Sequence, residues 1–332
     1  MPLELNTLNA LLLLLVGLIL LWKAADSLVA ASVDLASRLG ISPLVIGLTI
    51  VAMGTSAPEV AASIYAAVKN AGPLAIGNVY GSNIANLALV GGLCAIIRPL
   101  RVQTRIIKRE IPAMLITALL LWPFLHNLYL TRLEGTLLLI LFTLLIIITV
   151  IAAKTETKLK PQLNETIKDN INKEIKLVPK TITTSIIILL FSLAGLTIGA
   201  HLSITGAVFI GEKAGLSQTV IGLTIIAFGT SLPELATSLT AAVKGHHDIS
   251  IGNLVGSNIF NTLLVTGSAG LIKPFEISPR LIGTDYWVMI AVTITFIIMA
   301  IFGKKISRKD GIVLTTAYFA YMTYLLIATP SS

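Results

Sequence analysis

The chain contains one stretch of 48 residues twice, and this duplication restricts the folds that it can adopt. The segment from Val45 to Gly92 aligns without a gap with the segment from Val220 to Gly267, and 29 of the 48 positions are identical. Apolar residues match by chance, but the patterns GTS-PE and GN--GSNI-N recur at the same offset of 175 residues. We therefore interpret the chain as two copies of one structural unit.

The composition indicates the surroundings in which these copies fold. Of the 332 residues, 55% are hydrophobic and only 12% are charged, whereas soluble domains carry about 25% charged residues. The apolar runs reach the length of about 20 residues that crosses about 30 Å of hydrocarbon. The sequence therefore predicts an all-α polytopic membrane protein. Its ten predicted transmembrane helices are 9–37, 43–69, 73–97, 106–125, 131–153, 181–211, 218–244, 249–272, 281–302 and 309–328.

Lysine and arginine residues predict the orientation of these spans. The segments on one side would hold 18 of them, and the segments on the other side five. Because cytoplasmic loops are enriched in basic residues, the richer side, which includes the loop 154–180, is expected to be cytoplasmic. We predict a multi-pass protein of the plasma (inner) membrane with both termini outside.

The loop 154–180 separates residues 1–153 from residues 181–332, and each part holds five predicted spans. An odd number of spans between the copies turns the second copy upside down in the membrane. The sequence thus predicts two inverted five-helix repeats, an arrangement typical of transporters that bind their substrate near the middle of the bilayer. We interpret the basic loop as a solvated linker, with attraction to anionic lipid as the alternative.

Two glutamates, Glu59 and Glu234, lie inside predicted spans at equivalent positions of the two copies. A carboxylate at the centre of a membrane helix costs about 2.5–3.5 kcal/mol, so each is expected to face a polar interior. Each follows a proline, which removes a backbone hydrogen-bond donor, and we predict broken helices at the core whose carbonyls line a cavity. The carbonyls expected to be free lie near Ala52, Thr55, Ala227 and Thr230.

The second motif places Ser82 and Asn86, and likewise Ser257 and Asn261, four residues apart on one helix face. Together with the glutamates they offer only hard oxygen ligands. Such a set favours alkali and alkaline-earth cations over zinc or copper, and the flexible shell of Ca²⁺ over the tight octahedron of Mg²⁺. Two carboxylates are neutralised by one Ca²⁺ or by two Na⁺, which favours an exchanger. A passive cation channel and a metal-dependent membrane enzyme are the alternatives.

At these motifs both copies resemble the alpha-repeats of the cation/calcium antiporter superfamily. The GTS-PE form resembles the sodium/calcium exchanger branch, particularly its compact prokaryotic members. The resemblance covers nearly all ten spans and implies a core of spans 2, 3, 7 and 8, across which spans 1 and 6 slide. It implies one calcium site and several sodium sites. The ligands that it implies are Thr55, Ser56, Glu59, Ser82, Asn86, Thr230, Ser231, Glu234, Ser257 and Asn261, with the carbonyls of Ala52 and Ala227.

The function that the resemblance implies is the exchange of Na⁺ for Ca²⁺ by alternating access, and not catalysis by an enzyme. Ca²⁺ and Na⁺ are expected as transported substrates and membrane lipid as the surroundings, with no cofactor and no nucleic-acid partner. Thr-Ser in the glutamate motif, where proton-coupled members usually carry Asn, favours sodium coupling; a Ca²⁺/H⁺ exchanger is the first alternative. Asn261 stands where potassium-dependent branches carry Asp, which argues against potassium co-transport.

Overall fold

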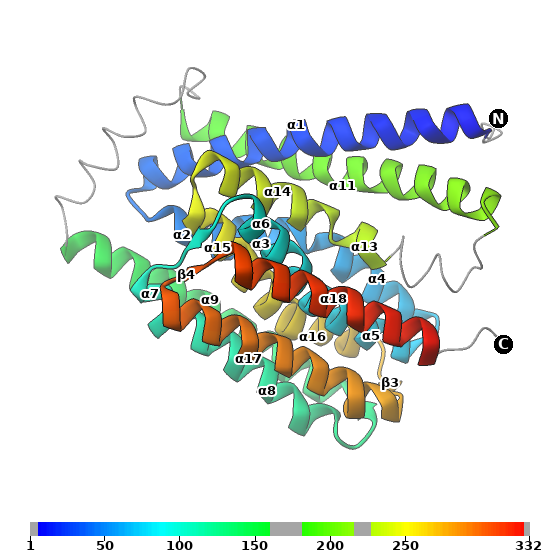
Figure 1. The fold of residues 1–332 in the computed structure, drawn as a ribbon. Helices are drawn as coiled ribbons and strands as arrows, with labels where there is room; N and C mark the ends of the chain where they lie inside the picture. The colour runs from blue at the N-terminus through cyan, green and yellow to red at the C-terminus, as the bar shows by residue number, and fades with distance from the viewer. Residues whose placement is uncertain (1–5, 160–180, 216–226, 329–332) are drawn as a thin grey trace.

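The structure is a computed structural model that describes residues 6–159, 181–215 and 227–328. Helices form nearly all of this part, and its strands are two-residue pairs at helix ends. Two long helices, α1 (Thr7–Leu39) and α11 (Ile182–Lys213), lie side by side along one edge of the bundle (Figure 1). The predicted loop 154–180 begins as helix up to Leu159, and its remainder, 160–180, lies outside the described residues.

Within the described residues, the two halves follow nearly the same order of elements. After α1 the first half contains α2 (Pro43–Ile46), the π-helical turn η1 (Gly47–Val51), α3 (Ala52–Thr55), α4 (Ala57–Val68), α5 (Gly72–Ile84), the π-helical turn η2 (Ala85–Val90), α6 (Gly91–Ile97), β1 (Leu100–Arg101), α7 (Thr104–Lys108), α8 (Glu110–Leu125), β2 (Tyr129–Leu130) and α9 (Arg132–Leu159). After α11 the second half contains α13 (Ala227–Thr230), α14 (Leu232–Lys244), α15 (His247–Phe260), the π-helical turn η4 (Asn261–Val265), α16 (Thr266–Ile272), β3 (Phe275–Glu276), the π-helical turn η5 (Leu281–Asp285), α17 (Tyr286–Gly303), β4 (Lys305–Ile306) and α18 (Arg308–Ala328).

The predicted helix breaks are present in both halves. Ser56 separates α3 from α4 with φ −84° and ψ 5°, and Ser231 separates α13 from α14 with φ −88° and ψ 5°. A proline, Pro58 or Pro233, occupies the first turn of the following helix, where its missing amide costs no hydrogen bond. In the first half the two helical segments meet at an angle of 42°. The same local sequence thus produces the same interruption twice.

The described residues do not test the predicted count of ten spans directly. Within the described residues, seven helices are long and apolar enough to cross a membrane, and the bent pair Pro43–Thr55 and Ala57–Val68 raises this to eight. Helix α8 has only 16 residues. The predicted span 218–244 begins outside the described residues. The chain is a polytopic membrane protein, and the count of ten stays a prediction.

Equivalent helices of the two halves run in opposite directions. Strand β1 pairs with β4 and β2 pairs with β3, so α8, which runs from β1 to β2, is antiparallel to α17, which runs from β3 to β4 (Figure 1). Helices α1 and α11 are also antiparallel, since Lys213 at the end of α11 donates to Thr7 at the start of α1. At their other ends Ser185 donates to Asp34 at 2.5 Å. An inverted repeat requires these reversals; its placement in a membrane stays a prediction.

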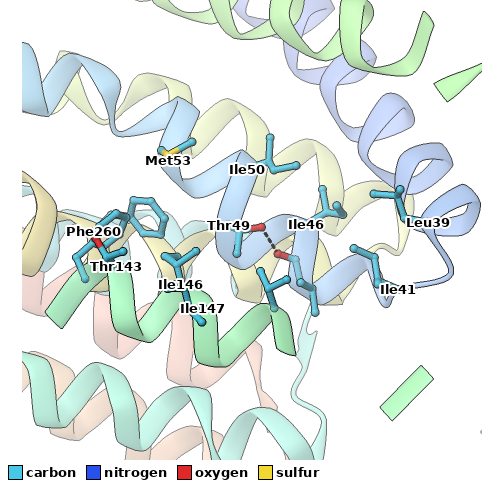
Figure 2. A pocket seen from close by; sticks show the side chains of 13 residues that line it. Leu39, Ile41, Ile46, Thr49, Ile50, Met53, Thr143, Ile146, Ile147 and Phe260 are labelled. Atoms are coloured by element: carbon cyan, nitrogen blue, oxygen red, sulfur yellow. Dashed lines mark hydrogen bonds between the residues drawn. The ribbon is translucent and has the colours of Figure 1, made fainter. Parts of the chain in front are cut away.

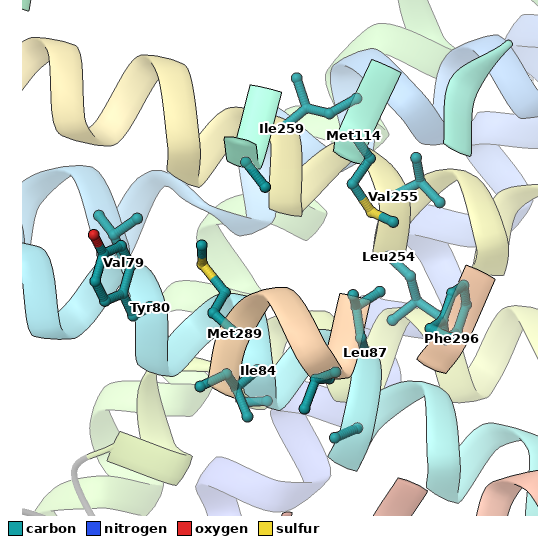
Figure 3. Packing of buried hydrophobic residues seen from close by; sticks show 14 of the residues in the cluster. Val79, Tyr80, Ile84, Leu87, Met114, Leu254, Val255, Ile259, Met289 and Phe296 are labelled. Carbon is teal, nitrogen blue, oxygen red and sulfur yellow. The ribbon is translucent and has the colours of Figure 1, made fainter. Parts of the chain in front are cut away.

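The apolar core lies where the two halves meet. Side chains of α5 and η2 pack against α15, and α8 and α17 enclose them (Figure 3). Leu87, Leu254 and Phe296 are fully buried there. Helix α15 also crosses η1 and α3 closely, because a Cβ atom on Gly256 would lie 2.8 Å from the carbonyl oxygen of Leu48. This crossing brings the serine and asparagine motif of the second half against the broken helix of the first.

Candidate cation site

Two buried glutamates form the centre of the candidate site. Glu59 in α4 and Glu234 in α14 are both 0% exposed. Each lies in the first turn of its helix, where the free backbone amides favour a negative charge. The Ser56 hydroxyl donates to Oε1 of Glu234 at 3.2 Å across the two halves, and the two carboxyl groups are near enough to repel each other. The structure therefore brings together the two carboxylates that the duplication singled out.

Many polar atoms of the predicted ligands have no hydrogen-bond partner among the described residues. These are both carboxyl oxygens of Glu59, Oε2 of Glu234, the hydroxyls of Ser231 and Ser257, and both side-chain polar atoms of Asn86 and Asn261. Buried polar atoms are usually bonded, and leaving one unpaired costs about 1–3 kcal/mol. Unpaired oxygens of this kind fit the coordination shell of a hard cation.

Two of these ligands lie in π-helical turns, which occur frequently at functional sites. Asn86 belongs to η2 and Asn261 begins η4. Turn η2 packs against α14, and turn η4 packs against α4. The turn that bears each asparagine therefore contacts the helix that bears the glutamate of the other half.

The remaining predicted ligands lie around the same helix breaks. The Ser82 hydroxyl lies beside the Glu59 carboxyl group. The Thr55 hydroxyl lies beside the Glu234 carboxyl group. Thr230 is the last residue of α13, which begins at Ala227. All predicted ligands thus lie in the two broken helices, in α5 and α15, or in the π-helical turns that follow them.

The carbonyl of Ala52 is not free as predicted, whereas its role as a cation ligand stays a prediction. It accepts the Ser56 amide at 3.0 Å and the Thr55 hydroxyl at 3.3 Å. The physical reason is that α3 completes its last turn before the chain reaches the proline. In the second half the Ser231 amide donates to the carbonyl of Phe228 at 3.2 Å. A cation at the Ala52 carbonyl would therefore compete with the Thr55 hydroxyl.

A pair of equivalent asparagines supports the site and was missed by the sequence reasoning. Asn78 Nδ2 donates to the Ser63 hydroxyl, and Asn253 Nδ2 donates to the Ser238 hydroxyl, both at 2.9 Å. Asn253 also accepts the Thr55 hydroxyl at 3.2 Å. The two asparagine–serine bonds connect each glutamate helix to the helix that follows it, and the Thr55 bond connects the two halves. The signal was available, since both asparagines belong to the duplicated GN--GSNI-N pattern.

A cavity of about 600 Å³ lies between the α2–α3 segment and α9 (Figure 2). Its walls are apolar side chains such as Ile46, Met53 and Phe260, together with two threonines. The Thr49 hydroxyl is occupied, because it donates to the carbonyl of Val45 at 2.6 Å. With no carboxylate in its lining, this cavity does not resemble a cation site.

The fold and the site together define a class: a polytopic membrane protein that holds a pair of carboxylates between two antiparallel halves. Residues 9–151 and 184–327 match the model of a family described as sodium/calcium exchanger protein. The chain belongs to the sodium/calcium exchanger family of the cation/calcium antiporter superfamily, and is of the compact prokaryotic type.

Relatives cover the chain over nearly its whole length. The putative antiporter CaxA of Alkalimonas amylolytica is 42% identical over 324 residues, which are 96% of this chain and 99% of that protein. The sodium/calcium exchanger MaX1 of Methanosarcina acetivorans is 34% identical over 352 residues, covering 95% of this chain and 97% of that protein. A structure of the sodium-calcium exchanger NCX_Mj, soaked with zero Na⁺ and Ca²⁺, matches with a TM-score of 0.81 and 30% identity over 98% of this chain and 100% of that chain. The chain is thus a cation/Ca²⁺ exchanger, in a family of transporters and not of enzymes.

Proposed function

We propose that the protein exchanges Na⁺ for Ca²⁺ by alternating access, with Glu59 and Glu234 as the central cation ligands. The observation that carries this proposal is the burial of one carboxylate from each half in a common site with unpaired oxygens. Their two negative charges are neutralised by one Ca²⁺ or by two Na⁺. Without a cation, the two carboxylates repel each other at a buried position, which disfavours the return of an empty carrier.

The proposed coordination shell adds neutral oxygens from both halves to these charges. Ca²⁺ takes six to eight oxygen ligands in flexible geometry, so two carboxylates alone do not fill its shell. Sodium and calcium would compete for overlapping oxygens, and competition couples their movements. The further proposed ligands are Thr55, Ser56, Ser82, Asn86, Thr230, Ser231, Ser257 and Asn261, with the carbonyls of Ala52 and Ala227 as additional candidates.

Helices α1 and α11 are the proposed moving elements. Their backbones approach closely, since a Cβ atom on Gly17 would lie 2.7 Å from the carbonyl oxygen of Gly199. Helix α1 contacts α14 through an ion pair of Asp26 and Lys244 at 2.5 Å, whose side chains are 50% and 35% exposed. Such an exposed pair contributes only about 0–1 kcal/mol. The contacts therefore favour α1 and α11 moving as one body across the core, with weak polar bonds that can be exchanged.

The proposed orientation places both termini outside and the basic segments in the cytoplasm. Pairing of β1 with β4 joins the segments 98–109 and 304–309, which together hold nine lysines and arginines, at one end of the bundle. The start of α1 and the end of α18 lie at the opposite end of the bundle, the end that also carries β3 (Figure 1). Segments assigned to the cytoplasm by their charge are thus neighbours in the fold.

The sodium requirement distinguishes this function from its alternatives. In vesicles that contain the purified protein, an outward sodium gradient is expected to drive calcium uptake, and sodium-free vesicles are expected to take up little. A pH gradient that replaces sodium fully would favour a Ca²⁺/H⁺ exchanger instead. Calcium flux that needs no counter-ion gradient would favour a passive channel.

Ser231→Ala is expected to raise the sodium concentration for half-maximal exchange about fivefold, with a smaller effect on calcium affinity. Loss of one neutral ligand costs about 1 kcal/mol, and the effect falls mainly on sodium if the Ser231 hydroxyl belongs to a sodium site that calcium does not share. The Ser231 hydroxyl has no hydrogen-bond partner among the described residues, so its removal disturbs no other bond there.

Ser56→Ala is the variant with which Ser231→Ala is compared. Its hydroxyl holds the Glu234 carboxyl group, so this variant is expected to affect both ions. Sodium and calcium dependence of exchange, measured for both variants, tests the assignment. Equal loss of sodium and calcium affinity in Ser231→Ala would argue against a separate sodium ligand at this position.

A further inference from the structure

One end of the bundle carries a cationic patch that the exchange reaction does not use. Strands β1 and β4 join two segments about 200 residues apart in the chain, and their register places Arg101 directly opposite Lys305. Like charges opposite each other destabilise a strand pair. The cationic patch consists of Arg98, Arg101, Arg105, Lys108, Arg109, Lys304, Lys305, Arg308 and Lys309.

Four of these nine side chains already form ion pairs or hydrogen bonds with other groups of the protein. Arg105 and Arg109 each approach Glu110 to 3.7 Å. Arg98 donates to the carbonyl of Val243, and Arg308 donates to that of Ile96 at 3.1 Å. Carbonyls near the ends of α14 and α6 thus fix these two arginines in place.

The other five cations are exposed and have no carboxylate within ion-pair distance in the described part of the chain. These are Arg101, Lys108, Lys304, Lys305 and Lys309. Two nearby acids are bound elsewhere: Asp248 accepts Gln103 Nε2 at 2.7 Å, and Asp310 accepts the Ser307 amide at 2.7 Å. These five side chains therefore present positive charge that no carboxylate in the described part of the chain pairs with.

The opposite end of the bundle shows that the fold does not require this charge. There β2 pairs with β3, and the register places Tyr129 opposite Glu276 and Leu130 opposite Phe275. The two strand pairs are equivalent under the duplication, yet only the β1–β4 pair places two cations opposite each other. The difference belongs to this chain's sequence and not to the fold.

We infer that the cationic patch binds the phosphate headgroup of an anionic phospholipid. The patch lies at the ends of α6, α17 and α18, where spanning helices reach the surface of a bilayer (Figure 1). A phosphate between Arg101 and Lys305 would turn their repulsion into attraction to a shared anion, and the guanidinium group can bind it through two parallel hydrogen bonds. The surrounding lysines add attraction over the range of a Debye length, about 8 Å at physiological salt. A lipid supplies this phosphate permanently, because the protein never leaves the bilayer.

Lipid binding by the full-length purified protein in detergent tests this inference. The protein is titrated with short-chain phosphatidylglycerol, short-chain phosphatidylcholine and inorganic phosphate. We expect saturable binding of phosphatidylglycerol that weakens as salt is added, and much weaker binding of the other two. Equal binding of the two lipids would overturn the inference, and inorganic phosphate binding as tightly as phosphatidylglycerol would overturn the assignment to a lipid.

Variants locate the binding on the patch. The double variant Arg101→Gln/Lys305→Gln is expected to bind phosphatidylglycerol about thirtyfold more weakly, at about 1 kcal/mol for each basic residue removed. Arg101→Lys is expected to retain most of the binding. Arg132→Gln, which removes an exposed cation next to β2, serves as the matched control and is expected to bind normally. Wild-type affinity in the double variant, with its thermal unfolding unchanged, would refute the site.

Discussion

Glutamine in place of Glu59 or Glu234 is expected to abolish calcium exchange while the protein remains folded. The substitution keeps the shape of the side chain and removes one of the two charges that face the cation. A unit charge pair at 4 Å is worth about 4 kcal/mol at an effective dielectric constant of 20, and Ca²⁺ doubles this figure. Even if dehydration offsets more than half of it, calcium affinity is expected to fall at least 100-fold, which corresponds to about 2.7 kcal/mol.

Calcium uptake into sodium-loaded vesicles and calcium binding to the purified variants measure this effect. Glu276→Gln is the matched control, because Glu276 is an exposed residue of β3 at one end of the bundle. It loses the same charge far from the site and is expected to exchange normally. Thermal unfolding separates lost binding from lost structure: removing one of two repelling carboxylates is expected to leave the unfolding temperature unchanged or higher. Normal exchange in Glu59→Gln would refute the role of the carboxylate pair.

The duplication explains why the centre of the site could be predicted from the sequence. Local sequence decides where a helix breaks, and the GTS-PE motif creates the same interruption at Ser56 and Ser231 because proline fits only the first turn of the next helix. Burial of Glu59 and Glu234 followed from the cost of placing a carboxylate in hydrocarbon. Both arguments need only a few neighbouring residues, and each applies separately to the two copies of the duplicated segment.

Features that depend on distant contacts could not be predicted in the same way. The Thr55 hydroxyl bonds to Asn253, 198 residues away, and this bond depends on how closely α15 crosses α3. The occupied carbonyl of Ala52 depends on where α3 completes its last turn. The pairing of β1 with β4 joins segments about 200 residues apart and depends on the packing of the whole bundle. Hydropathy and motif spacing contain no information on any of these.

A covalent link between α1 and α14 is expected to stop exchange, if α1 and α11 slide over the core as proposed. Asp26 and Lys244 already form an ion pair between these helices, so cysteines at both positions lie within reach of a maleimide cross-linker that contains a reducible disulfide. The buried native Cys94 is replaced by serine to avoid side reactions. We expect sodium-driven calcium uptake to fall close to the background of empty vesicles after cross-linking and to return after reduction.

A second cross-link, between α1 and α11, serves as the control for the link between α1 and α14. Lys213 at the end of α11 bonds to Thr7 at the start of α1, and cysteines at these two positions join the helices that are proposed to move together. This link is expected to leave exchange nearly unchanged, because the distance between its ends stays constant during sliding. Loss of exchange with both links would mean that α1 and α11 move relative to each other. Full exchange with the α1–α14 link in place would mean that access alternates without any movement of α1 across the helix that bears Glu234.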